Sequence, residues 1–132
     1  MTRFLICTAA LLGLAACVPP PVEVGRALYG DACAVCHGPL GKGDGSLAGD
    51  LPKRPADLTG LSARNGGVFP QGAVMAVIDG YNRRDDPHGV MPEFGEVLQE
   101  GRLVPVDIGD GRQTPTPERL VALAAYVERL QE

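Results

Sequence analysis

The 132-residue sequence has no tryptophan, and only three tyrosines and three phenylalanines. So few aromatic side chains leave a thin hydrophobic core, which is hard to stabilise without help in a chain of this size. Basic residues are also scarce. Only 12 Lys and Arg are scattered among 16 Asp and Glu, for a net charge of −4, so nucleic acid is not an expected partner. The length allows a single ordinary domain and excludes a multi-domain enzyme.

A hydrophobic run long enough to cross a bilayer is absent as well. The apolar run Phe4–Ala16 follows Arg3 and falls short of the roughly 20 residues that a membrane-spanning helix needs. A positive start and a short apolar run are typical of a secretory signal peptide, predicted over residues 1–16. The run ends in Leu14-Ala15-Ala16-Cys17, which resembles a bacterial lipobox and implies acylation of the Cys17 thiol. The alternative is a plain signal peptide that contains a cysteine.

The residues after the predicted cleavage site read as a short tether. If Cys17 is the mature N-terminus, its diacylglyceryl and N-acyl chains suffice for stable anchoring in a membrane. Residues 17–23 are rich in proline and are predicted to be extended polyproline II. Such a segment reaches about 20 Å, so the remaining domain, residues 24–132, would lie close to the membrane. The expected location is the periplasmic side of a bacterial membrane, inner or outer.

The four cysteines are the most informative residues of the sequence. Cys7 lies in the predicted signal peptide and Cys17 in the lipobox, which leaves Cys33 and Cys36 in Cys33-Ala-Val-Cys-His37. This spacing is that of c-type haem attachment. Two thiols on one helical turn can add to the two vinyl groups of one porphyrin, and the adjoining imidazole reaches the iron. We predict one covalent haem c on Cys33 and Cys36, with His37 as an axial iron ligand.

Three other uses of this motif fit less well. A thioredoxin-like Cys-x-x-Cys pair needs a preceding strand and an α/β pattern, and neither is predicted here. A zinc site needs four ligands, and beyond this motif the mature chain offers only His88, Cys17 and carboxylates. A disulfide between Cys33 and Cys36 would close almost no loop and would therefore stabilise little.

Five stretches between residues 24 and 132 share a familiar pattern: Gly25 to Tyr29, Cys33 to Gly45, Pro55 to Thr59, Met91 to Phe94, and a C-terminal amphipathic helix with Tyr126. Together they resemble a class I cytochrome c domain of the small single-haem bacterial kind. The resemblance implies an all-α fold of three to four helices around one haem, with electron transfer as the activity. Residues 95–115 depart from it, because they form an extended insertion before the last helix, with a hairpin as one possibility.

Two methionines besides the initiator are candidates for the sixth iron ligand. Met75 falls on the apolar face of a helix predicted over residues 72–80, where a methionine is usually core filler. Met91 lies in a loop punctuated by glycine and proline, and Met91-Pro92 matches the axial-ligand motif of the family. Met91 is therefore the predicted ligand. Three alternatives remain: Met75, His88 in the same loop as Met91, and an open iron site.

The first half of the predicted domain holds one long helix and a long irregular region. The helix is predicted over residues 24–36. In the resembled family, Gly25 and Tyr29 pack it against the last helix, where a small residue allows close crossing. Residues 38–50 contain five glycines and form a tight loop. Residues 51–70 are predicted to be irregular. Here the resemblance implies a carbonyl that accepts a hydrogen bond from the His37 ring, and Pro55 is its candidate.

The last helix is clearly marked in the sequence. Thr116 is its predicted cap, Pro117 suits its first turn, and Glu118 complements the helix dipole there. Apolar residues recur at helical spacing along one face: Leu120, Leu123, Ala124, Val127 and Leu130.

A haem held by His37 and Met91 has no free position for a substrate, and a thioether raises the reduction potential relative to a second imidazole. The sequence shows no Ser/His/Asp arrangement and no pair of converging carboxylates. We therefore expect an electron carrier rather than an enzyme, with membrane-bound redox proteins as donor and acceptor. Alternatives are a haem enzyme or gas sensor with an open sixth position, and an electron-entry subunit of a larger membrane redox complex.

Overall fold

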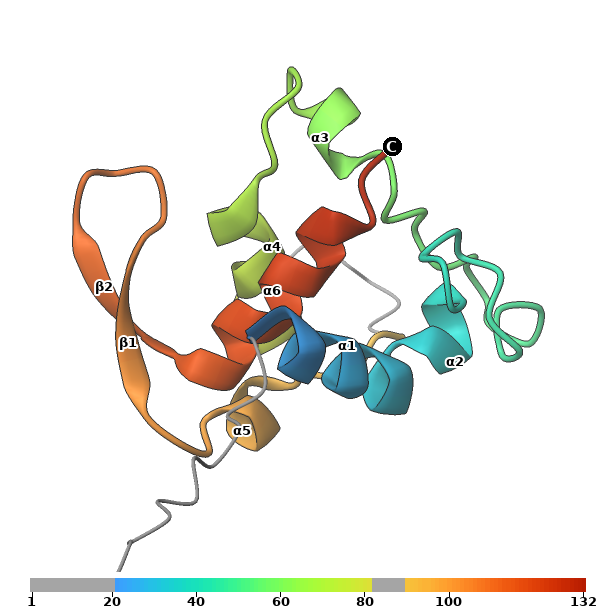
Figure 1. Cartoon of the computed structure of the whole chain (residues 1–132). Coiled ribbons are helices and arrows are strands. Elements are labelled where there is room, and N and C mark those ends of the chain that lie inside the picture. Colours follow the sequence, from blue (N-terminus) through green and yellow to red (C-terminus); the bar gives the residue numbers. More distant parts are fainter. Residues whose placement is uncertain (1–20, 82–89) are drawn as a thin grey trace, which may run out of the picture.

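The computed structural model describes residues 21–81 and 90–132 of the chain (Figure 1). The predicted signal peptide, Cys7, Cys17 and the first residues of the tether lie outside the described residues, and so does His88. The elements follow in the order α1 (Pro21–Ala32), α2 (Ala34–His37), α3 (Leu61–Arg64), α4 (Gln71–Asp79), α5 (Gly95–Leu98), β1 (Leu103–Asp107), β2 (Gln113–Pro117) and α6 (Glu118–Arg129).

The fold is mostly helical, but it differs in detail from the predicted all-α arrangement. The described residues form six helices instead of three to four, because three of them, α2, α3 and α5, are single turns of four residues. The chain also forms a two-stranded sheet, which corrects the all-α class to mostly α. Within residues 21–81 and 90–132, no helix has both the length and the apolar character needed to span a bilayer.

Helix α1 begins three residues earlier than predicted, since Pro21 to Glu23 form its first turn rather than an extended tether. Proline is well suited to a first helical turn, where its missing N–H is not needed. Glu23 also pairs with Arg26 at 2.7 Å, across one turn of the helix. The predicted helix over residues 24–36 is interrupted at Cys33, which separates α1 from α2.

Helices α1 and α6 cross at the centre of the molecule, as the resemblance implied (Figure 1). Gly25 and Tyr29 are buried on α1 and meet α6. The rings of Tyr29 and Tyr126 lie 5.2 Å apart between centroids, in a tilted arrangement. The crossing is the main part of a small hydrophobic core, whose buried members are Tyr29, Met75, Ile78, Leu98, Leu120, Leu123, Ala124 and Val127. The predicted apolar face of the last helix is therefore confirmed.

Helix α4 matches the predicted helix over residues 72–80 to within one residue at each end. It stops where Gly80 adopts the left-handed conformation, with φ of 99°, which ends a helix at little steric cost when the residue is glycine. Met75 and Ile78 face the core, and only 5% of Met75 is exposed. The interpretation of Met75 as core filler is thus confirmed.

The insertion before the last helix is an antiparallel hairpin, β1 with β2, which projects to one side of the helices in Figure 1. Thr116 pairs with Val104 in this hairpin, and its hydroxyl donates to the carbonyl of Thr114 at 3.0 Å. The prediction that Thr116 caps the last helix is therefore wrong, because strand pairing continues up to Pro117. On the inner side of the hairpin, Val106 packs against the hydrophobic core.

The C-terminus ties the last helix to the loop before α3. The Gln131 amide nitrogen donates to the carbonyls of Leu58 and Val127 at 2.8 and 2.9 Å. Its oxygen accepts from the Ser62 amide at 2.8 Å. One side chain therefore satisfies three backbone groups and holds residue 58 and the first turn of α3 against α6.

Candidate functional site

The Cys-x-x-Cys-His motif begins at Cys33, between α1 and α2, and continues through the whole of α2. The amides of Cys36 and His37 both donate to the carbonyl of Cys33, at 3.1 and 2.8 Å. This single turn places both sulfurs and the imidazole on neighbouring positions of one short helix. Cys33 and Cys36 are free thiols and are half-buried. The structure thus brings together the three residues predicted to attach the cofactor.

The Cys33 thiol lies in an environment that keeps it neutral. Burial, and secondarily the charge of the neighbouring Cys36, raise the pKa of the Cys33 thiol to about 11. Redox-active Cys-x-x-Cys pairs work through a thiol whose pKa is lowered. The direction of this shift disfavours the thioredoxin-like use of the motif.

The glycine-rich segment after His37 folds back over the end of α2. The amides of Gly43, Gly45 and Leu47 donate to the carbonyls of His37, Cys36 and Val35 at 2.8, 3.1 and 2.9 Å. These are the last carbonyls of a helix, which have no partners within the helix itself. Gly43 has a φ of +70°, and a Cβ at this position would meet the carbonyl oxygen of Pro55. The close approach of the two loops therefore requires glycine here.

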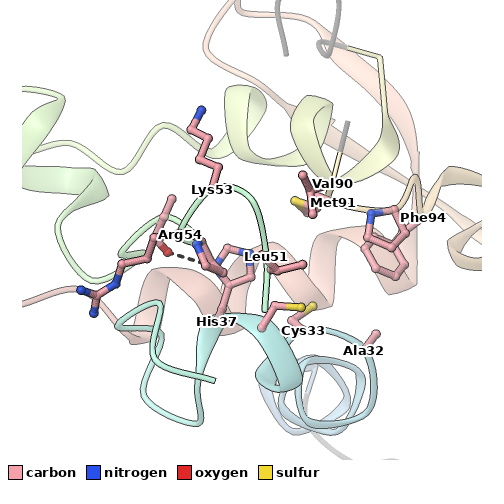
Figure 2. A pocket seen from close by; sticks show the side chains of 13 residues that line it. Ala32, Cys33, His37, Leu51, Lys53, Arg54, Val90, Met91 and Phe94 are labelled. Atoms are coloured by element: carbon pink, nitrogen blue, oxygen red, sulfur yellow. Dashed lines mark hydrogen bonds between the residues drawn. The ribbon is translucent and has the colours of Figure 1, made fainter. Parts of the chain in front are cut away.

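The His37 ring is oriented by the backbone of the second loop. Its Nδ1 lies 3.0 Å from the carbonyl oxygen of Ala56 (Figure 2). Because a carbonyl can only accept, Nδ1 carries the proton and Nε2 keeps its lone pair for a metal. The prediction that Pro55 supplies this carbonyl is wrong by one residue, since the Pro55 carbonyl faces Gly43 instead.

The segment that carries Ala56 is itself fixed on its C-terminal side. The Asp57 carboxylate accepts hydrogen bonds from the Thr59 hydroxyl and amide at 2.7 and 2.8 Å. These hydrogen bonds lower the pKa of Asp57, and the bond from the Thr59 hydroxyl has the larger effect. The amide of Leu58 donates to the Gly41 carbonyl at 2.7 Å, which ties the segment to the glycine-rich loop. The Ala56 carbonyl, which accepts from His37, is thus held in place by hydrogen bonds within its own segment and by one to the glycine-rich loop.

Two neighbouring cavities open in front of this imidazole, with volumes of about 260 and 250 Å³. Four residues line both of them: Cys33, His37, Ala56 and Met91. Figure 2 shows Met91 across the first cavity from His37, with Cys33 on a third side. The second cavity reaches the core, and its remaining lining residues are apolar apart from Tyr29, whose hydroxyl donates to the Gly38 carbonyl at 2.6 Å.

Met91 and Met75 differ in their relation to these cavities. Met91 is half-buried and lines both, whereas Met75 lies in the core and lines neither. His88, the other weighed ligand, lies outside the described residues. Among the described residues, the thioether that shares the cavities with His37 is therefore that of Met91.

The donor set and the cavities fit a c-type haem. A covalently held haem with two axial ligands would use two thiols beside an imidazole, a second donor across the cavity, and an apolar space between them. Cys33, Cys36, His37 and Met91 provide the donors. A zinc site has less support, since in the described part of the chain no group of three His, Cys, Asp or Glu side chains is placed so that it could hold a metal ion.

Several residues of the site carry no signal in the sequence that would place them there. Leu51, Lys53, Arg54 and Val90 line the first cavity. They come from an irregular loop and from the segment around Met91, which have no periodic pattern. Only the path of these loops brings them to the cavity.

Comparison with known proteins supports a c-type cytochrome domain. A family model described as cytochrome C oxidase, cbb3-type, subunit III matches residues 20–104, whereas no curated protein matches the chain. The family match covers more than half of the chain and includes Cys33, Cys36, His37 and Met91. The chain belongs to this family of c-type cytochrome domains.

Proposed function

We propose that this member of the cbb3-type subunit III family is a membrane-anchored, periplasmic electron-transfer protein with one haem c, ligated by His37 and Met91. Its family supports covalently bound haem c and haem-based electron transfer. The observation that carries the ligand assignment is that His37 and Met91 line the same two cavities beside Cys33. When bound, the haem supplies a centre that gains or loses one electron.

The residues of the chain set the properties of such a centre. The Ala56 carbonyl holds the His37 ring in one orientation, so little rearrangement accompanies a change of charge. The Met91 thioether favours a higher reduction potential than a second imidazole would. The second cavity is lined by apolar residues of the core. This lining would exclude water and disfavour the additional positive charge of ferric iron. With His37 and Met91 both bound to the iron, no position would remain there for a substrate, so the centre would carry electrons.

The visible spectrum of the purified full-length protein tests this assignment. We expect a low-spin spectrum when oxidised, with a charge-transfer band from thioether to ferric iron, and a reduced spectrum that carbon monoxide does not change. A high-spin component, or a shift under carbon monoxide, would indicate an open iron site. The ligand assignment would then be wrong, and a haem enzyme or gas sensor would replace the electron carrier.

The proposed anchor is a lipid on Cys17, which follows removal of residues 1–16 and begins the predicted tether of residues 17–23, whose last three residues lie in α1. The lipobox-like sequence supports this part of the proposal. A Cys17→Ser variant is expected to move from the membrane fraction to the soluble periplasmic fraction, since it loses the acylated thiol. A Cys7→Ser variant is the matched control and keeps the membrane association. Equal membrane association of the two variants would rule out the lipid anchor.

The partners we propose are a membrane-bound redox donor and acceptor, which the tether keeps at a high effective concentration. The family description favours one form of this role, an electron-entry subunit of a larger oxidase. Co-elution of the detergent-solubilised full-length chain with oxidase activity would support the subunit, and elution without it would support a free carrier.

A further inference from the structure

The segment that carries Met91 is anchored to the end of helix α4 by a backbone hydrogen bond. The Phe94 amide donates to the Ile78 carbonyl at 3.1 Å. Phe94 also packs against the hydrophobic core, and Leu98, one turn later, is buried there with 4% of its surface exposed. Because the three residues from Met91 to Phe94 span at most about 11 Å, this hydrogen bond limits how far Met91 can lie from α4.

Two glycines allow the two segments to approach each other closely at this anchor. Gly95 is buried, and a Cβ there would lie 2.5 Å from Oδ1 and 2.7 Å from the carbonyl oxygen of Asp79, the last residue of α4. A Cβ at Gly80 would lie 2.7 Å from Cγ and 2.9 Å from Cδ of Glu93. Unstrained contacts between such atoms are about 3.5–4.0 Å. We call this contact, of Asp79 and Gly80 with Glu93 and Gly95, the glycine clamp.

The two glycines of the clamp are required for different reasons. Gly80 has a φ of +99°, a conformation that by itself favours glycine. Gly95 is not among the glycines with positive φ, so the backbone conformation there does not exclude alanine. What excludes a side chain at Gly95 is the lack of space against the backbone and the carboxylate of Asp79. The requirement for glycine at residue 95 therefore arises from the position of the Met91 segment against α4.

We propose that Gly95 is a positioning residue for Met91, because it lets the glycine clamp close and thereby holds the thioether at the sixth iron position. This inference rests on the proposed function, in which Met91 is the axial ligand. Helix α4 lines the second cavity through Val77 and Ile78, so a segment fixed to α4 is also fixed relative to the cavity wall. A thioether that is already held in place loses little conformational freedom when it binds, and it therefore competes well against external ligands.

Imidazole binding to the ferric, full-length haem protein tests the proposal, since imidazole takes the sixth position only when Met91 leaves it. We expect Gly95→Ala to raise the affinity for imidazole by roughly ten- to a hundredfold, which corresponds to about 1.4–2.8 kcal/mol. Overpacking of a closely fitted contact has costs of this size. The charge-transfer band from thioether to ferric iron should weaken in the same variant. Imidazole titrations followed in the visible spectrum measure both changes.

Gly25→Ala is the matched control, because it adds the same methyl group at another crowded contact, the crossing of α1 and α6. It lowers the stability of the whole domain but leaves the glycine clamp intact. Its imidazole affinity should stay within about twofold of the unaltered protein wherever both are folded, since the two sites share no contact partner. A similar rise in Gly25→Ala and Gly95→Ala would show that a general loss of stability releases Met91, and it would overturn the positioning role.

Gly80→Ala is a milder second variant, because the three atoms nearest to its Cβ all belong to the exposed side chain of Glu93, which can move aside. We expect a smaller rise in imidazole affinity. Adding Glu93→Ala, which removes Cγ and Cδ, should reverse part of this rise, and a rise that it does not reduce would contradict the clamp contact. This pair decides the question if Gly95→Ala does not fold.

The outcomes separate this inference from the proposed function. Unchanged imidazole affinity in Gly95→Ala and in Gly80→Ala, with the charge-transfer band intact, would overturn the positioning role and leave electron transfer in place. A carbon monoxide shift in the unaltered protein would instead contradict ligation by Met91 itself, and both proposals would then fall.

Discussion

A Met91→Ala variant is expected to bind carbon monoxide when reduced, whereas the unaltered haem protein is not. Met91 lines both cavities opposite His37, and alanine has no donor atom to fill the sixth position. We also expect the charge-transfer band from thioether to ferric iron to disappear and a high-spin component to emerge. Loss of the thioether should lower the reduction potential as well. Visible spectra with and without carbon monoxide, and a redox titration, measure these changes.

Met75 provides the control for this experiment. It is the other methionine of the described residues, and it lies in the core away from the cavities. Met75→Leu conserves side-chain volume, so it should cost less than about 1.5 kcal/mol and leave the spectrum unchanged. A normal low-spin spectrum in Met91→Ala, or an altered one in Met75→Leu, would contradict the assignment of Met91 as the ligand.

A Gly25→Ala variant is expected to lose about 3 kcal/mol of its free energy of unfolding, because the crossing of α1 and α6 leaves no room for a side chain. A Cβ at Gly25 would meet the carbonyl oxygen of Ala122 and lie 2.6 Å from its carbonyl carbon. It would also lie 3.0 Å from the Cβ of Tyr126. Since backbone cannot move aside as a flexible side chain can, the helices must separate. Denaturant unfolding of the haem-bound protein measures the loss.

Gly30 is the matched control, because it lies on the same helix and a Cβ added there would meet no atom within 4 Å among the described residues. Alanine has a higher helix propensity than glycine, so Gly30→Ala should gain roughly 0.5–1 kcal/mol. Opposite signs for the two substitutions are the expected result. Equal stability of the two variants would show that the helices do not cross closely at Gly25.

Local patterns in the sequence predicted the elements whose structure depends on neighbouring residues. The Cys-x-x-Cys-His motif spans one turn, so its spacing alone indicates that two thiols and an imidazole lie together. The apolar periodicity of α6 and the helix around Met75 were readable for the same reason, since helical contacts repeat every three to four residues. The buried pair Gly25 and Tyr29 followed from the family resemblance.

The tertiary structure decided what depends on residues far apart in the chain. The acceptor for His37 lies 19 residues away at Ala56, and only the contact of its loop with Gly43 shows that it is not Pro55. Thr116 resembled a helix cap because nothing local reveals its pairing with Val104.

Lys53 and Arg54 likewise reach the cavity through an irregular loop without periodicity. A motif of a few residues specifies its own conformation through short-range hydrogen bonds. The path of a loop is set by hydrogen bonds and packing with distant segments, and these form only when the whole chain is folded.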